Sequence, residues 1–226
     1  KKGLVMSLPL PTGDESFEFF YSPVVEPGLQ EEYPHIRSYK AYGVEDRSKV
    51  ARITISQLGL KASVRTADGE IYIDPFIEGQ TEFHAAYNVN DFDPMLIHEA
   101  MPSCGNEGIF DASPIEHLHE HEDDHQHNGL RSAGEPIQLR TFRTAIATTG
   151  EWSLAEGGKD NAVAKVISCV DRGNQIFENE VGFRLVLVAN NASIVYDDPT
   201  LDPYTGSEPK SGRDLIGMNT TVLNSR

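Results

Sequence analysis

The chain has 226 residues, of which 38% are hydrophobic and 24% are charged, so it is long enough for one large domain or two ordinary ones. Its formal net charge of -16 argues against binding to nucleic acids or anionic membranes, because phosphate groups would be repelled. The sequence has no run of eighteen apolar residues, which a membrane-spanning helix would need.

The first hundred residues contain short segments in which apolar and polar positions alternate, a pattern typical of β-strands. The alternating apolar residues are Phe17, Phe19 and Tyr21, then Leu60, Ala62 and Val64, then Ile71 and Ile73. Asp68 and Gly69 separate the last two groups and predict a hairpin, because glycine accepts the positive φ that a tight turn requires. This half is expected to be an antiparallel β domain.

Cys104 lies in the segment Met-Pro-Ser-Cys-Gly-Asn-Glu, whose flanks lack the apolar periodicity of a core cysteine. Pro102 restricts the approach to the thiol, and Gly105 permits an unusual backbone angle directly after it. A thiolate presented on such a turn is a good zinc ligand and can take the position of a catalytic water. The alternative is an ordinary loop thiol.

Residues 111–128 contain five histidines and six acidic residues but no Lys or Arg, a composition typical of a linker. Within it, His121 to His125 reads His-Glu-Asp-Asp-His and fits the letter of the zinc motif H-E-x-x-H. We reject a catalytic role, because no apolar stripe would hold such a helix in a core. Arg131 also stands where a third histidine ligand would be needed. Adventitious metal binding by His121 and His125 remains an alternative.

From Gln138 onward the pattern predicts a β-α-β unit: a strand over 139–149, an amphipathic helix over 160–179 and an apolar strand over 183–189. The last strand is nearly continuous in apolar residues and is expected to be covered on both faces. Beyond Tyr196 the sequence predicts a loop, with no recognisable closing element. Because no third or fourth strand follows, the second domain is expected to be truncated; the alternative is a domain much smaller than usual.

Cys169 lies among apolar residues at helical spacing, which predicts a buried structural thiol. A disulfide between Cys104 and Cys169, the two cysteines of the sequence, stays open as an alternative.

The segment Met101–Gly105 resembles the Pro-x-Cys-Gly switch of matrix metalloproteinases and the related Cys-Gly element of reprolysin-type proteases. Four further segments resemble the propeptide of bacterial secreted reprolysin-like (M12-type) zinc metalloproteases of the metzincin class: Leu8–Gly13, Pro34–Tyr39, Tyr42–Asp46 and Ile71–Phe76. In the second half, three segments resemble the opening strand, first helix end and next strand of the catalytic domain: Leu139–Trp152, Asn174–Glu178 and Phe183–Asn191.

The resemblance implies an α+β chain in which an antiparallel β-rich propeptide precedes the β-α-β start of an α/β metzincin catalytic domain. Its parts would be a propeptide with a cysteine switch (1–110), an acidic His-rich linker and processing region (111–137), and a truncated catalytic domain (138–226). The His-Glu-x-x-His-x-x-Gly-x-x-His helix would lie beyond Arg226. This chain would then hold no catalytic residue and would be inactive alone.

The resemblance further implies a secreted, zinc-dependent endopeptidase whose propeptide keeps it latent when Cys104 binds the active-site zinc. The partners would be its own catalytic domain and the protein or peptide substrates of the mature enzyme. A calcium site is possible on the acidic loop with Asp197, Asp198 and Asp202. The alternatives to a latent precursor are a non-catalytic folding chaperone or trans-acting inhibitor, and a metal-binding module.

Overall fold

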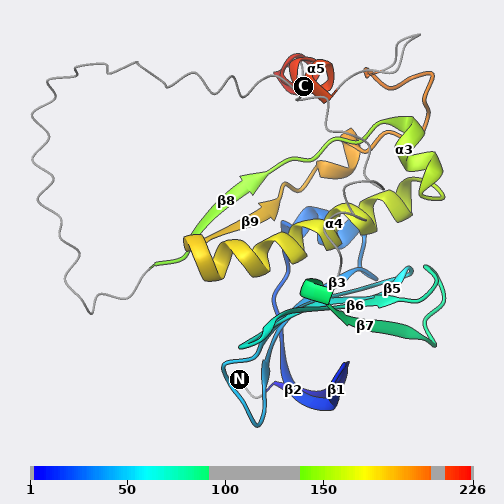
Figure 1. The fold of residues 1–226 in the computed structure, drawn as a ribbon. Coiled ribbons are helices and arrows are strands. Elements are labelled where there is room, and N and C mark those ends of the chain that lie inside the picture. The colour runs from blue at the N-terminus through cyan, green and yellow to red at the C-terminus, as the bar shows by residue number, and fades with distance from the viewer. Residues whose placement is uncertain (1–2, 92–137, 205–211, 225–226) are drawn as a thin grey trace, which may run out of the picture.

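The computed structural model describes residues 3–91, 138–204 and 212–224. Two sheets lie on opposite sides of one long helix, α4 (Figure 1). The elements before residue 92 are β1 (Leu4–Leu10), β2 (Gly13–Tyr21), α1 (Pro27–Glu32), β3 (Arg37–Gly43), β4 (Val50–Ser56), β5 (Gly59–Thr66), β6 (Gly69–Pro75), β7 (His84–Asn88) and the 3-10 helix η1 (Val89–Asp91). The elements after residue 137 are β8 (Arg140–Thr144), α3 (Gly150–Ala155), α4 (Lys159–Ile176), the π-helix η2 (Phe177–Val181), β9 (Phe183–Leu187), the 3-10 helix η3 (Asn191–Ile194) and α5 (Gly212–Asn224).

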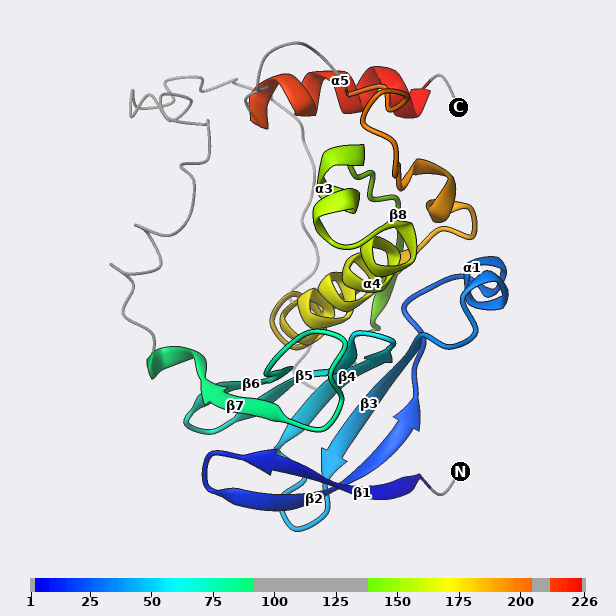
Figure 2. The ribbon, with the colours of Figure 1, turned by 90° about the vertical axis from the view of Figure 1, so that its right-hand side faces the viewer.

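The first sheet is an antiparallel meander whose seven strands, β1 to β7, pair in sequence order. It curls, and β1 comes close to β6 and β7 (Figure 2). The expectation of an antiparallel, β-rich first half is confirmed. So is the hairpin, in which Thr66 pairs with Gly69 and Gly69 takes a φ of +122°.

The apolar residues of the meander face the inside of the curl and form its core. The buried members of this core are Leu8, Leu10, Phe17, Phe19, Ala41, Ala51, Ile53, Ala62, Val64, Ile71 and Ile73. Strand β4 is buried on both faces, because successive side chains point to opposite sides of a sheet. Ala51 and Ile53 join the core, while Arg52 and Thr54 face α4.

The second sheet consists of β8 and β9, which are parallel and joined through α4. The predicted β-α-β unit is thus confirmed, although β8 ends at Thr144 instead of Thr149, whose side chain caps α3. The expectation that the second strand is covered on both faces is wrong. Only Leu187 of β9 is buried, because within the described residues α4 packs on one face of this two-stranded sheet.

Helix α4 buries the stripe that its sequence predicts, including Val163, Val166, Ile167 and Val170. The expectation that Cys169 is buried is wrong: its side chain is exposed. Position 169 lies at the edge of the apolar stripe, so its neighbours on the helix face the core and it does not. Helix α5 is a closing element that the sequence reading missed. Within the described residues, no helix is both long and apolar enough to cross a membrane.

Candidate functional site

Helix α4 holds both sheets through two buried amide side chains. Asn174 Nδ2 donates to Leu185 O at 2.8 Å, and Asn174 Oδ1 accepts from Leu185 N at 2.7 Å, so this amide binds β9. The next residue, Gln175, donates from Nε2 to Val50 O on β4 at 2.7 Å. We call the surface on which residues 3–91 meet residues 138–204 the docking interface.

The centre of the docking interface is a buried ion pair. Arg52 Nη1 on β4 donates to Asp171 Oδ1 on α4 at 3.1 Å, and the two side chains are 1% and 2% exposed. Thr54 Oγ1 donates to the other carboxylate oxygen of Asp171 at 2.8 Å. Arg52 Nη2 also pairs with Glu178, which accepts from Lys40 Nζ at 2.9 Å. Charges from both parts of the chain therefore pair with each other, and Arg52 and Asp171 at the centre are shielded from water.

The surroundings of this cluster shift two of its pKa values. Burial raises the pKa of Asp171 to about 7, while the charge of Arg52 and the hydrogen bond from Thr54 act in the opposite direction. Burial, together with the charge of Arg52, lowers the pKa of Arg184, whose Nε lies 3.5 Å from the Glu178 carboxylate. Desolvation is thus the largest influence on the carboxylate at the centre of the interface.

A second contact lies at the outer edge of β9, where the segment after β2 adds one parallel bridge. Leu187 N donates to Val24 O at 2.8 Å, and Glu26 N donates to Leu187 O at 2.9 Å. The Glu26 carboxylate accepts from Arg143 Nε at 2.5 Å, from Arg143 Nη2 at 3.2 Å and from Ala189 N at 2.8 Å. The hydrogen bond from Arg143 is the main reason why the pKa of Glu26 is lowered. The N-terminal part therefore occupies an edge of the second sheet.

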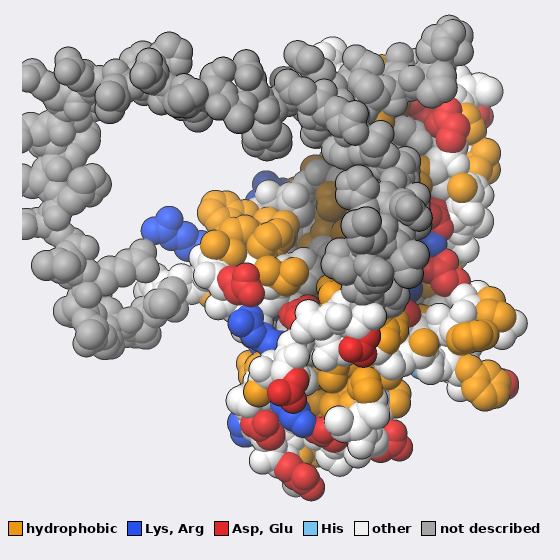
Figure 3. Space-filling model, viewed as in Figure 1, with side chains coloured by type: hydrophobic (Ala, Val, Ile, Leu, Met, Phe, Trp, Pro, Cys, Tyr) orange, Lys and Arg blue, Asp and Glu red, His pale blue; other side chains and the backbone are white. Residues whose placement is uncertain are grey.

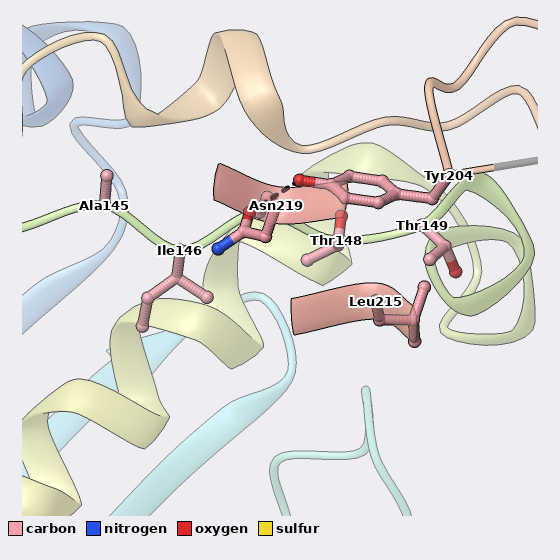
Figure 4. A pocket seen from close by; sticks show the side chains of 8 residues that line it. Ala145, Ile146, Thr148, Thr149, Tyr204, Leu215 and Asn219 are labelled. Carbon is pink, nitrogen blue, oxygen red and sulfur yellow. Dashed lines mark hydrogen bonds between the residues drawn. The ribbon is translucent and has the colours of Figure 1, made fainter. Parts of the chain in front are cut away.

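Two cavities flank the stretch 145–149 that follows β8. One of about 300 Å³ is lined by Tyr204, Leu215 and Asn219, and Tyr204 Oη donates to Asn219 Oδ1 at 2.7 Å (Figure 4). The other, of about 410 Å³, is mainly apolar and is lined by residues that include Trp152 and Cys169. Among the described residues that line them, neither cavity has an acid–base pair beside a nucleophile, so these residues support no catalytic assignment.

Hydrophobic side chains gather on the surface where β8 and β9 begin (Figure 3). Phe183 stacks on Phe177 with a centroid distance of 4.7 Å and meets the edge of Phe142 at 5.5 Å. The Phe142 side chain is half exposed. This aromatic group lies at the end of the β-α-β unit where β8 and β9 begin.

The site residues expected from the sequence are not among those that the structure places. Cys104, His121 and His125 lie in 92–137, outside the described residues, and so does the proposed linker 111–137. Three expectations that depend on these residues stay predictions: the zinc switch at Cys104, adventitious metal binding by His121 and His125, and a disulfide between Cys104 and Cys169. In the parts of the chain that are described, no three His, Cys, Asp or Glu side chains form a group able to hold a metal ion.

The acidic loop considered for calcium uses its carboxylates within the chain. Asp202 is buried, and it accepts from Gly150 N at 2.6 Å and from Tyr204 N at 2.7 Å. Asp198 accepts from the backbone and side chain of Thr200 at 2.8 and 2.7 Å. Asp198 therefore closes a turn of the loop and Asp202 joins the loop to the start of α3, so the geometry of these two carboxylates gives calcium binding no support.

The residues of the docking interface were missed by the sequence reading, although one of them carries a signal. Asp171 follows Val170 at a core position of the predicted helix, and a charged residue at such a position is rarely left without a partner. Arg52 carries no such signal, because it alternates with Ala51 and Ile53 and the period of two assigns it to the polar face of the strand. The identity of the partner, 119 positions away in the sequence, could not be read from the pattern.

A comparison with protein families finds a match to the model described as Metallo-peptidase family M12B Reprolysin-like, over residues 138–224. The match covers the β-α-β unit, the acidic loop and α5. No curated protein and no solved structure matches the chain. The first sheet thus lies outside the matched range. Residues 138–224, which we call the M12B segment, are therefore similar to the reprolysin-like metallopeptidases of family M12B.

Proposed function

We propose that this chain is the precursor region of a secreted, zinc-dependent metalloendopeptidase, in which residues 1–110 are a propeptide that keeps the enzyme latent. The observation that carries the proposal is the docking interface, in which the buried Arg52 of the first sheet pairs with Asp171 of the M12B segment. A separate domain that only shared the chain would not need to bury a charge against the metallopeptidase part. An inhibitory propeptide does need a specific, intimate contact of this kind.

In the proposal, Cys104 binds the active-site zinc of the complete enzyme and blocks the position of its catalytic water. In the same proposal, this chain contributes the inhibitory ligand, and the helix that holds the zinc would belong to another part of the complete enzyme. Cleavage within residues 111–137 then separates the thiol from the metal. Secretion and the protein or peptide substrates belong to the same proposal, since they follow from the resemblance to secreted reprolysin-like enzymes.

The test replaces Cys104 with alanine in the complete precursor and measures cleavage of a fluorogenic peptide before any processing. Cys104→Ala should raise this activity to near that of the processed enzyme. The matched control is Cys169→Ala, which removes the exposed cysteine of α4 and should leave latency intact. Equal latency in the wild type and Cys104→Ala would overturn the switch.

The mixed core favours a second candidate function, that of a folding chaperone or trans-acting inhibitor. Val24, Leu29 and Ile36 of the first part pack in one core cluster with the buried face of α4. Without them this face would be open to water while the M12B segment folds. The measurement is the refolding yield and activity of the mature enzyme with and without added residues 1–110. No effect on either would remove this candidate.

A further inference from the structure

The docking interface has an apolar centre to which both parts of the chain contribute. Its buried members before residue 92 are Val24, Val25, Leu29, Tyr33, Ile36 and Leu58. Those after residue 137 are Ala162, Val163, Ala164, Val166, Ile167, Val170, Leu187, Ala192 and Val195. An interface that forms one core from two parts resembles an obligate subunit contact, in which neither part buries its apolar face alone.

Charges around this centre are complementary in both directions. Seven ion pairs between described residues cross the interface: Lys40–Glu178, Arg52–Asp171, Arg52–Glu178, Arg65–Glu180, Asp74–Arg172, Glu78–Lys165 and Glu26–Arg143. The first part supplies the cation in four pairs and the anion in three. Because the signs alternate across the surface, a shifted arrangement would bring like charges together, and the pattern selects a single register.

The backbone adds a third mode of recognition at the edge of β9. The two hydrogen bonds between the segment 24–26 and Leu187 form a single parallel bridge, which pairs with β9 as one residue of an added strand would, and Glu26 extends the contact to Arg143 on β8. Strand addition is a common way to bind a partner, since the main chain supplies affinity and the side chains supply specificity. It also protects an edge that would otherwise be free to pair with other chains.

All of these contacts are noncovalent, and each joins a residue before 92 to a residue after 137. We propose that the first part and the M12B segment stay bound to each other when the chain is cut between residues 92 and 137, so that cleavage alone does not release the propeptide. The link between them raises their local concentration, but the core, the ion pairs and the added strand do not depend on it. The partner that fits the docking surface of residues 3–91 is therefore the M12B segment itself, supplied in trans.

The inference rests on the proposed function only for the natural cleavage of the chain; the binding of the two parts to each other does not depend on it. In that setting activation has two steps, the cut and the separation, and the separation sets how quickly the mature surface becomes free. The M12B segment also keeps its apolar face and the edge of β9 covered until a second event removes the propeptide.

The test uses the full chain with a recognition sequence for a site-specific protease placed within residues 111–128. After complete cleavage, confirmed by mass spectrometry, the sample is run on a size-exclusion column over a series of loading concentrations. Both fragments should elute together at the volume of the uncut chain and separate in urea. Elution as two separate fragments in native buffer at micromolar concentration would overturn the proposal.

Variants then show whether the named contacts hold the fragments together. Arg52→Met leaves Asp171 and Glu178 without their buried partner and should raise the dissociation constant about a hundredfold or more. Its matched control is Arg47→Met, which removes an arginine that pairs with Glu18 within the first sheet and should leave co-elution unchanged. Should Arg52→Met fail to fold by circular dichroism, Glu26→Gln takes its place. Glu26→Gln, which weakens the edge contact, should raise the constant about tenfold.

If the two fragments co-elute as firmly in every folded interface variant as in the wild type, the assignment of the docking interface is overturned. Cys104→Ala and added chelator separate this result from the zinc switch, because neither should affect co-elution. Fragments that part only in Cys104→Ala or with chelator would mean that the switch alone joins them, and this too would overturn the inference. Latency can thus fail its own test while retention stands, and the reverse holds as well.

Discussion

Asp171 is the point at which burial and charge pairing oppose each other most directly in this molecule. Its carboxylate is enclosed by β4 and α4, and it has one cation, Arg52, and one hydroxyl donor, Thr54, within hydrogen-bond distance. Glu178 competes for the same arginine, and Arg184 adds a more distant positive charge. Such a cluster fixes which surfaces meet, while its net contribution to stability depends on the protonation state of the carboxylate.

We predict that Asp171 makes the chain less stable as the pH rises from about 4 to about 7. The folded-state pKa of about 7 lies above the value of about 3.9 for a free aspartate, so the folded protein retains a proton that the unfolded chain loses. The stabilising contribution is therefore complete below the unfolded pKa, and it is lost as the pH rises through the folded pKa. Asp171→Asn should remove this part of the pH dependence, as measured by urea denaturation at a series of pH values.

The control for this prediction is Asp198→Asn. Hydrogen bonds from Thr200 lower the pKa of Asp198, so its contribution is present above the unfolded pKa and is lost only as the pH falls below it. Asp198→Asn should leave the slope between pH 5 and 7.5 as it is in the wild type. A slope that is equally steep in Asp171→Asn would show that Asp171 does not carry it.

At the level of elements, the apolar periodicity of the sequence predicted part of the secondary structure and little of the packing between elements. Three strands of the first half, β2, β5 and β6, and the helix α4 followed from their spacing, whereas β1, β3, β4, β7 and α1 were not predicted as separate elements. Helix α5 has the apolar spacing of Leu215, Met218 and Val222, but residues with weak helix propensity stand between them. The burial of β9 and the exposure of Cys169 depend on elements that are distant in the sequence, and a local pattern does not show which of them pack there.

The residues of the candidate site were also predicted only in part from the sequence. Cys104 was found from its local motif and stays a prediction, because it lies outside the described residues. The docking interface could not be found, since its members lie far apart in the sequence, by 119 positions for Arg52 and Asp171, and pair only through the fold. Only the charge of Asp171, at a core position of the predicted helix, indicated that a partner existed.

Two glycines give opposite predictions for the same substitution. Gly150 begins α3 where the chain passes close to the acidic loop, and an added Cβ would lie 2.4 Å from both Asp198 C and Pro199 N. Both atoms belong to the backbone and cannot rotate away. Gly150→Ala should therefore lower the free energy of unfolding by about 1–3 kcal/mol.

Gly217 is the matched control, because it lies within α5 and an added Cβ would meet nothing within 4 Å. Gly217→Ala should raise the stability of that helix by up to about 1 kcal/mol, since alanine is the better helix former. Urea denaturation followed by circular dichroism measures both variants. Similar effects of the two substitutions would contradict the close packing of α3 on the loop.

Across the whole molecule, the family match and the packing divide the chain differently. The M12B match covers residues 138–224, whereas the buried cluster around α4 also takes in Val24, Val25 and Leu29 from the first part. A boundary drawn from sequence similarity would cut through this core. The expected division into 1–110, 111–137 and 138–226 therefore stays a prediction about processing, and the packing describes which residues must fold together.

This shared core predicts that the described parts of the chain unfold together in a single transition. Trp152, the one tryptophan of the sequence, lies on α3 and reports on the M12B segment, while far-UV circular dichroism also records the first sheet. The two signals should give the same midpoint in urea, because loss of either part exposes the apolar face that the other covers. Arg52→Met should separate the two midpoints, whereas Arg47→Met should shift neither. Two distinct transitions in the wild type would mean that the parts fold independently, and the docking interface would then be too weak to hold a cleaved propeptide.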